Sequence, residues 1–214
     1  MITMNEEKAI HKVISDIMIA VPDAEVLVVD SSTDHTPEIA EKLGARVIRQ
    51  FPPKGYGAAM ARALESSKGD VIVTLDCDDT YPTDQIAIMA DMVLSGRYDL
   101  VDGSRLRNKP QAMPMINYLA NWGFARLASI LFLKNLTDLH SGMRAYRKSM
   151  LDSLKFDPHG AALPVELLLL PIKHNYKYKN HFIEYRERIG QSTMQPLDSA
   201  KWTLKRIINV KLWK

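Results

Sequence analysis

Three carboxylates follow the most clearly apolar strand that the sequence predicts. Asp76, Asp78 and Asp79 come directly after the run 71–75. Hard divalent cations such as Mg²⁺ prefer oxygen ligands and commonly take one or two carboxylates together with substrate phosphates and water. A cation held in this way neutralises the charge that develops on a diphosphate leaving group. The spacing therefore predicts a metal and diphosphate site. The alternative is that these acids only cap the helix that follows.

Two further segments offer groups for a phosphate-bearing ligand. Asp30 follows the β-branched run 25–29, where a carboxylate can accept a hydrogen bond from a base N–H or a ribose hydroxyl. Lys54 begins a glycine-containing loop, 54–57, which can present backbone N–H groups and one ammonium to a phosphate at a helix N-terminus. The loop matches neither the P-loop nor the dinucleotide-binding pattern. An ordinary turn before a helix is the alternative for both segments.

Arginines form two short clusters beside glycine turns. Arg144 and Arg147 make the first, and Arg186 and Arg188 the second. A guanidinium binds phosphate in a bidentate fork, so both clusters are candidate phosphate contacts, with pairing to surface acids as the alternative. The histidines show neither metal-ligand spacing nor a Ser-His-Asp arrangement, which leaves hydrolase chemistry with little support.

Short apolar strands alternate with helices and determine where these side chains lie. Strands are predicted at 25–30, 46–49, 70–76, 99–103 and 181–185, and helices at 36–43, 58–64, 82–95, 113–135 and 201–214. Near-continuous apolar strands separated by helices predict an α/β fold, with a mostly parallel sheet covered by helices on both faces. Ligands of such sheets bind outside the carboxyl ends of the strands, where Asp30 and Asp76 are both expected.

Composition excludes several classes of protein. The 214 residues are 46% hydrophobic and 25% charged, which suits one globular domain with at most a short appendage. A net charge of +3 gives no reason to expect nucleic acid as a partner. Cys77 is the only cysteine, which favours a reducing compartment, and we find neither a secretory signal nor an apolar run of the roughly 18 residues that span a membrane. We expect a cytoplasmic protein, either soluble or peripheral at the cytoplasmic membrane face.

The C-terminal segment 201–214 has the pattern of a basic amphipathic helix. Its apolar side chains recur at helical spacing between lysines and arginine, and Trp202 and Trp213 suit a headgroup boundary. We divide the chain into a domain at 1–200 and this helix at 201–214. The segment predicts contact with a membrane surface, with the 113–135 helix as a second contact. Alternatively, both stripes pack on the sheet or against a second copy of the chain in a homo-oligomer.

Taken in order along the chain, these motifs resemble family 2 glycosyltransferases with the GT-A (Rossmann-like) fold. The matching segments are Asn5-Glu6-Glu7, 28–36, 54–59, Asp76-Cys77-Asp78-Asp79-Thr80-Tyr81-Pro82, Asp102-Gly103-Ser104-Arg105, 138–147 and 185–192. The resemblance spans nearly the whole chain, and the order and spacing are more specific than any one motif. The second half is most similar to the branch of polyprenyl-phosphate (dolichyl-phosphate) mannosyl- and glucosyltransferases.

The resemblance implies an inverting, metal-dependent hexosyltransferase that uses a UDP- or GDP-sugar donor and a polyprenyl phosphate acceptor. Its implied cofactor is Mg²⁺ or Mn²⁺, held by Asp78 and Asp76. The implied donor contacts are Glu6, Glu7, Asp30, Lys54, Asp76 and Arg188. The implied acceptor contacts are Arg105, Ser141, Arg144 and Arg147, with Asp78, Asp138 and Arg144 as the catalytic group. An ionised phosphate needs little general-base help, so catalysis would consist of positioning and charge neutralisation.

Several positions depart from the pattern of the family. Only Ile2-Thr3-Met4 precede Asn5, so either the first strand is short or the start lies upstream. Thr80 stands where this branch often has glutamine, and Thr193 where a lysine is usual.

Three alternatives remain open. A hydroxyl acceptor would need Asp138 or Asp79 as its base. A weakened relative would act as a binding or scaffold subunit. A nucleotidyltransferase would carry a glycine-rich basic loop after its first strand, and Asn5-Glu6-Glu7 is not such a loop.

Overall fold

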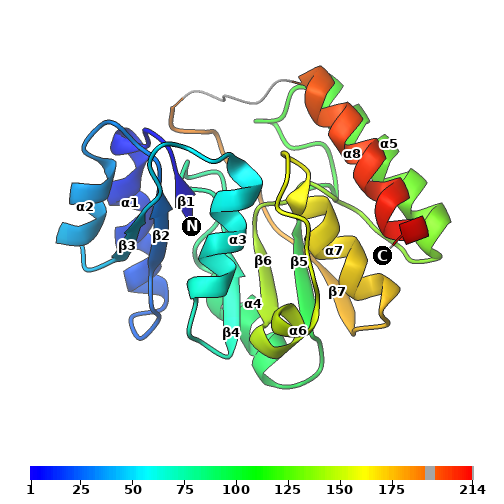
Figure 1. The fold of residues 1–214 in the computed structure, drawn as a ribbon, viewed down its shortest axis with the longest axis horizontal. Coiled ribbons are helices and arrows are strands. Elements are labelled where there is room, and N and C mark those ends of the chain that lie inside the picture. Colours follow the sequence, from blue (N-terminus) through cyan, green and yellow to red (C-terminus); the bar gives the residue numbers. More distant parts are fainter. Residues whose placement is uncertain (191–195, 214) are drawn as a thin grey trace.

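The protein is described by a computed structural model that covers residues 1–190 and 196–213 (Figure 1). Its strands are β1 (Ile2–Thr3), β2 (Leu27–Asp30), β3 (Arg46–Arg49), β4 (Val71–Thr74), β5 (Leu100–Ser104), β6 (Arg144–Arg147) and β7 (Tyr178–Phe182). Its helices are α1 (Glu7–Ala20), α2 (Thr36–Lys42), α3 (Tyr56–Ser66), α4 (Gln85–Leu94), α5 (Met115–Phe132), α6 (Lys148–Ser153), α7 (Leu163–Lys173) and α8 (Pro196–Trp213).

The strands form two sheets in which most neighbours run parallel. The first sheet has the order β1-β2-β3 and is parallel throughout, with Thr3 opposite Asp30. The second has the order β4-β6-β5-β7, in which β6 runs antiparallel to both β4 and β5, and β7 runs parallel to β5. The predicted α/β fold with a mostly parallel sheet is confirmed, and β6 is the strand that breaks the pattern.

Helices cover both faces of these sheets because the strand side chains alternate between two cores. One core joins α1, α2 and α4 to side chains such as Val28, Val101 and Ala145. The other joins α3, α5, α6, α7 and α8 to Ile72, Leu100 and Tyr146. Leu100 and Val101 are adjacent and face opposite cores, as expected for a strand that is buried on both sides.

Helices α5 and α8 lie side by side at one end of the molecule (Figure 1). Helix α8 begins at Pro196, earlier than the predicted start at 201, and it buries Ile207 and Val210 in the same core as α7. The strand predicted at 181–185 lies earlier, at Tyr178–Phe182, because it pairs in register with Leu100–Ser104 of β5. Within the described residues, no helix is long and apolar enough to cross a membrane.

Candidate active site

Asp76 lies just beyond the carboxyl end of β4, in contact with the turn that precedes β6. A Cβ atom added at Gly142 would lie 2.5 Å from Asp76 Oδ2, so only glycine leaves room for this carboxylate. The same turn is fixed by Tyr81, whose hydroxyl accepts a hydrogen bond from Gly142 N at 2.7 Å, and by Thr74, which donates to Gly142 O at 2.8 Å. Among the described residues, the Asp76 carboxylate has no hydrogen-bond or ion-pair partner.

Asp78 is buried two residues further on and is held by groups from two segments. Its Oδ1 accepts a hydrogen bond from the Thr80 hydroxyl at 2.5 Å, and its Oδ2 lies 2.5 Å from Arg188 Nη2. The backbone joins the same segments, because Ile189 N donates to Asp78 O and Arg186 N donates to Thr80 O. Arg188 is therefore next to the predicted metal ligand. The hydroxyl of Thr80, the position that departs from the family pattern, binds that ligand directly.

The acids around Asp78 repel one another. Burial and then the Asp78 carboxylate raise the pKa of Asp76 to about 6. Burial and then Asp78 also raise the pKa of Glu6 to about 7, while Arg188 opposes the shift. Arg105 and Arg188 oppose the shift at Asp76, yet its pKa stays raised, and this favours a site that takes up further positive charge.

This donor set fits a divalent cation that brings part of its own coordination shell. Within the described residues, no group of three His, Cys, Asp or Glu side chains converges tightly enough to hold a metal. Asp76 and Asp78 are two carboxylates, and within the described residues Asp76 has no hydrogen-bond or ion-pair partner to give up. Mg²⁺ and Mn²⁺ commonly bind to one or two carboxylates with phosphate oxygens and water as the other ligands.

The other predicted donor residues lie in different surroundings. Glu7 points to α2, where its Oε2 accepts a hydrogen bond from His35 N at 3.2 Å. Lys54 is exposed and makes no hydrogen bond or ion pair within the described residues. Asp79 pairs with Lys12 of α1 at 2.8 Å. Of the two glutamates that the sequence could not separate, Glu6 is the one near Asp76 and Asp78.

Asp30 is fully buried at the end of β2 and both of its oxygens have partners. Oδ2 accepts hydrogen bonds from Thr3 and from Ser32 Oγ, both at 2.6 Å. Oδ1 accepts one from Ser32 N and pairs with the half-exposed Arg49. A carboxylate has about four acceptor positions. A base N–H that binds Asp30 must therefore displace one of these donors, and Arg49 is the most exposed of them.

Asp138 and Arg105 form a bidentate pair across the turn from Asp76. Arg105 Nε lies 2.7 Å from Asp138 Oδ2, and Arg105 Nη2 lies 3.0 Å from Oδ1. The guanidinium also lies 5.1 Å from the ring centroid of Tyr185. Burial alone would raise the pKa of Asp138, but Arg105 brings it below its ordinary value. Within the described residues, Nη1 of Arg105 has no hydrogen-bond partner.

Two predicted acceptor contacts, Ser141 and Arg144, are bound to groups inside the protein. The Ser141 hydroxyl donates to Gly103 O at 2.5 Å. Arg144 is fully buried, its Nε lies 2.5 Å from Asp102 Oδ1, and its other nitrogens donate to Leu139 O and Pro164 O. No nitrogen that carries its charge remains free for a ligand. In this structure Arg144 contacts the 139–142 turn through the carbonyl oxygen of Leu139.

Arg147, the third residue predicted as an acceptor contact, lies at the opposite end of β4 from the acids. In the antiparallel register, Arg147 lies opposite Val71, the first residue of β4, whereas Arg144 lies opposite Thr74, the last. Arg147 pairs with Asp99 at 2.8 Å. Arg144 and Arg147 are close in the sequence, but they lie at opposite ends of strand β6.

Three contributors to the site were not predicted from the sequence. Tyr81 fixes Gly142, Asp102 neutralises Arg144, and Lys12 neutralises Asp79. Tyr81 and Asp102 lie within the segments that match the family pattern, and this match could have indicated them. Gln191, Ser192 and Thr193 lie outside the described residues, as do the side chains of Trp213 and Lys214.

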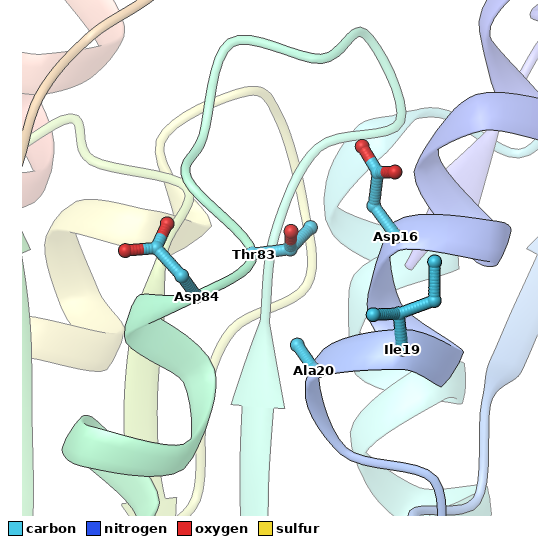
Figure 2. Close-up of a pocket in the computed structure, with 5 residues that line it drawn as sticks. All are labelled: Asp16, Ile19, Ala20, Thr83 and Asp84. Atoms are coloured by element: carbon cyan, nitrogen blue, oxygen red, sulfur yellow. The ribbon is translucent and has the colours of Figure 1, made fainter.

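An open depression of about 350 Å³ lies away from these groups, between the last turns of α1 and the segment before α4 (Figure 2). It is lined by Asp16, Ile19, Ala20, Thr83 and Asp84. Its two carboxylates already have cationic partners, since Asp16 pairs with Lys12 at 2.6 Å and Asp84 lies 3.8 Å from Arg186. We do not assign it to the active site.

The acids at the carboxyl ends of the strands and the mostly parallel sheet define a glycosyltransferase of the GT-A type. Residues 1–155 match the model of the family described as "Glycosyl transferase family 2". The chain belongs to glycosyl transferase family 2, which confirms the resemblance seen in the motifs.

Individual relatives agree with this assignment. The chain is 42% identical over 211 residues to a dolichyl-phosphate hexose transferase of Haloferax volcanii, covering 98% of this chain and 91% of that relative. It is 33% identical over 200 residues to the low-salt glycan biosynthesis hexosyltransferase Agl6 of the same organism, covering 90% of this chain and 48% of that longer protein.

A solved structure agrees in fold. Glucosyl-3-phosphoglycerate synthase from Mycobacterium tuberculosis, crystallised with Mn²⁺, UDP-glucose and phosphoglyceric acid, is 26% identical with a TM-score of 0.72. The match covers 99% of this chain and 76% of that one.

Proposed function

We propose that this protein transfers a hexose from a nucleotide-sugar donor to dolichyl phosphate or a similar polyprenyl phosphate, with inversion at the anomeric carbon. The dolichyl-phosphate hexose transferase to which it is 42% identical supports this choice of acceptor. The phosphate oxygen of the acceptor attacks the sugar on the side opposite the leaving nucleotide. The protein positions the two phosphates and balances their charges.

The donor half of the site is the group around Asp78. Asp76 and Asp78 would hold Mg²⁺ or Mn²⁺, and the cation would neutralise the charge that develops on the leaving diphosphate. Arg188 is half-exposed and lies within reach of the same position, so it exchanges Asp78 for a diphosphate oxygen when the donor enters. Glu6 approaches the same group from the start of α1 and contacts the nucleoside.

The observation that best supports a phosphate acceptor is that both candidate bases are already paired. Asp138 is bound to Arg105 through both oxygens, and Asp79 is bound to Lys12. A hydroxyl acceptor needs a carboxylate that is free to take a proton, whereas an ionised phosphate does not. Arg105 keeps Nη1 available beside Tyr185, and this nitrogen can bind an acceptor oxygen.

The paired helices α5 and α8 give the protein a surface suited to a lipid acceptor. Their outward apolar side chains are Met115, Ile116, Leu119, Trp122, Ile130, Trp202, Leu204, Ile208 and Leu212. Cationic side chains surround them, and Arg126, Lys205 and Lys211 each lie over an aromatic ring of the two helices. Apolar side chains bordered by positive charge suit the interface of an anionic bilayer. The protein would act as a peripheral protein at the cytoplasmic face of the membrane.

A donor and acceptor screen tests the reaction. Purified protein is incubated with UDP- and GDP-hexoses, with Mn²⁺ or Mg²⁺, and with a short polyprenyl phosphate. The matched control acceptor is the polyprenyl alcohol of the same chain length, and 3-phosphoglycerate serves as a soluble phosphate acceptor. We expect cation-dependent transfer to the polyprenyl phosphate alone. Transfer to the alcohol would contradict the assignment of the acceptor, and no binding of any nucleotide would favour a scaffold subunit.

Co-sedimentation with vesicles tests the membrane surface. We expect binding to vesicles that contain anionic lipid and weaker binding as salt is raised. Ile116→Ser, at a side chain that is 72% exposed on α5, should weaken binding, whereas Ile19→Ser, at one that is 81% exposed on α1, should not. Equal effects of the two variants would contradict the proposal. Light scattering tests the alternative that a second copy of the chain covers this face, because such a homo-oligomer would dissociate in the Ile116→Ser variant.

A further inference from the structure

His140, in the active-site turn, contacts both surface helices, α5 and α8. Its Nε2 lies 2.8 Å from the hydroxyl of Thr203, a buried residue of α8. Its ring meets Phe124 of α5 edge to face, with centroids 5.9 Å apart. Within the described residues, the other ring nitrogen, Nδ1, is buried without a hydrogen-bond partner. Thr203 therefore provides the hydrogen bond that orients this ring.

His140 belongs to the same turn as the acceptor-side pair. Its backbone N donates to Asp138 Oδ1 at 3.0 Å, and the same oxygen accepts from Arg105 Nη2 at 3.0 Å. Gly142, two residues later, lies against Asp76. A shift of the His140 ring therefore moves the backbone that fixes Asp138, and Asp138 in turn fixes the guanidinium of Arg105.

Helix α8 is a rigid support at this position. Three residues after Thr203, Arg206 pairs with the buried Glu166 of α7 and donates to the carbonyl oxygens of Asp157 and His159 at 3.0 and 2.5 Å. The residues on either side of Thr203, Trp202 and Leu204, are on the outward face. The same turn of α8 thus faces both the solvent and the acceptor side of the active site.

We propose that α8 is a working part of the acceptor site, in which Thr203 and His140 are positioning residues that set the Asp138–Arg105 pair for the acceptor phosphate. This inference rests on the proposed function. It adds that the helix outside the catalytic motifs sets acceptor affinity, in addition to its contact with a membrane. Neither residue needs to touch the substrate.

Steady-state kinetics of Thr203→Val test the inference. Valine keeps the volume of threonine and removes the hydroxyl. The assay uses a short polyprenyl phosphate that is soluble without vesicles, so that membrane binding does not contribute. Loss of one buried hydrogen bond should raise KM for the acceptor about tenfold and leave KM for the nucleotide-sugar within about twofold. Thr203→Ser should restore the wild-type value. Asn209→Ala, on the same helix, is the matched control and should change neither constant.

The outcomes separate the two proposals. Wild-type protein that binds the nucleotide-sugar but does not transfer to the polyprenyl phosphate overturns the proposed function, and this inference with it. Wild-type transfer together with a Thr203→Val acceptor KM within about twofold overturns the inference alone. Equal changes in the donor and acceptor constants without rescue by serine show a merely structural role and also overturn it. Phe124→Leu tests the contact from α5 and should raise the acceptor KM in the same direction.

Discussion

The donor and acceptor sides of this site treat their charges in opposite ways. On the donor side, Glu6, Asp76 and Asp78 lie near Arg188, and burial, followed by repulsion from Asp78, raises the pKa values of Glu6 and Asp76. On the acceptor side, every acid has its own guanidinium, with Asp138 bound to Arg105 and Asp102 bound to Arg144. The donor side therefore has more carboxylates than cations, whereas on the acceptor side Asp138 and Asp102 are each balanced by an arginine.

This difference indicates which parts of the site wait for a ligand and which parts hold it in shape. An excess of carboxylates is stabilised when cations arrive with the nucleotide. The buried acceptor-side pairs instead fix the backbone around them, since Arg144 donates to Leu139 O and Pro164 O and Asp138 accepts from His140 N. Arg105 combines both roles, because two of its side-chain nitrogens bind Asp138 and one is left over.

The largest effect is expected on stability, from breaking the buried ion pair between Arg144 and Asp102. Arg144→Met leaves Asp102 buried without its partner, so the free energy of unfolding should fall by about 3 to 5 kcal/mol. Arg147→Met is the matched control, since its partly exposed pair with Asp99 should contribute about 1 kcal/mol or less. Urea denaturation measures both. An Arg144 variant of normal stability that has lost only acceptor binding would restore the role first predicted for this residue.

The next effect is expected on the donor side. Arg188→Ala should lower kcat/KM for the nucleotide-sugar about 100-fold or more, because no other guanidinium is equally near Asp78, and the fold should be unchanged. Arg186→Ala is the control two residues away. Its exposed side chain lies 3.8 Å from Asp84 and should be dispensable within about twofold. Steady-state kinetics measure kcat/KM for both variants, and thermal melting tests whether their fold is unchanged. Equal losses in the two variants would argue against a specific diphosphate contact.

These first two comparisons show how far the sequence could predict the site. Asp30, Asp76 and Asp78 lie where they were expected, because apolar strands followed by acids place those acids at the carboxyl edge of a parallel sheet. The surroundings of Arg144 and Arg147 were not predicted, because proximity along the chain does not show that the two lie at opposite ends of an antiparallel strand or that Arg144 pairs with Asp102.

The contact between α8 and His140 shows a second limit. Both segments were visible as a polar turn and a basic amphipathic helix. Their meeting joins residues 63 positions apart, and it depends on how α5, α7 and α8 pack together. Hydrophobic spacing predicts that a helix has a buried face but does not identify which polar residues lie on that face, here Thr203 and Arg206. Thr203 was therefore not predicted.

The acceptor side should also respond to acid. Burial lowers the pKa of His140 from 6.5 to about 4, so the unfolded chain binds a proton more readily than the folded one. The stability linked to neutral His140 is present above about pH 6.5 and is lost as the pH falls toward about 4, which amounts to about 2 kcal/mol at pH 5. Chemical denaturation at several pH values measures the slope. His140→Gln should flatten it, and an unchanged slope would contradict this assignment.

The smallest effects should separate two adjacent glutamates on the donor side. Glu6→Gln should weaken nucleotide-sugar binding about fivefold, since Glu6 is the one near Asp76 and Asp78. Glu7→Gln should leave binding unchanged and cost under about 1 kcal/mol of stability, because Glu7 accepts a hydrogen bond at the start of α2. Calorimetric titration of both variants makes the comparison. Weaker donor binding in the Glu7 variant would show that the side chain turns toward the nucleotide.

The most direct test of the account is the cation dependence of donor binding in two variants of adjacent aspartates. Asp78→Asn keeps an acceptor for Thr80 but removes the charge next to Arg188, whereas Asp79→Asn removes one of the two carboxylates that pair with Lys12. Calorimetry with the UDP- or GDP-hexose selected by the screen, with and without Mn²⁺, should show strong binding to wild type and Asp79→Asn only when Mn²⁺ is present. The enhancement by Mn²⁺ should fall at least about tenfold in Asp78→Asn. Donor binding to wild type that does not depend on Mn²⁺ would contradict a metal and diphosphate site at Asp78. An equal loss of the Mn²⁺ enhancement in the two variants would also contradict it.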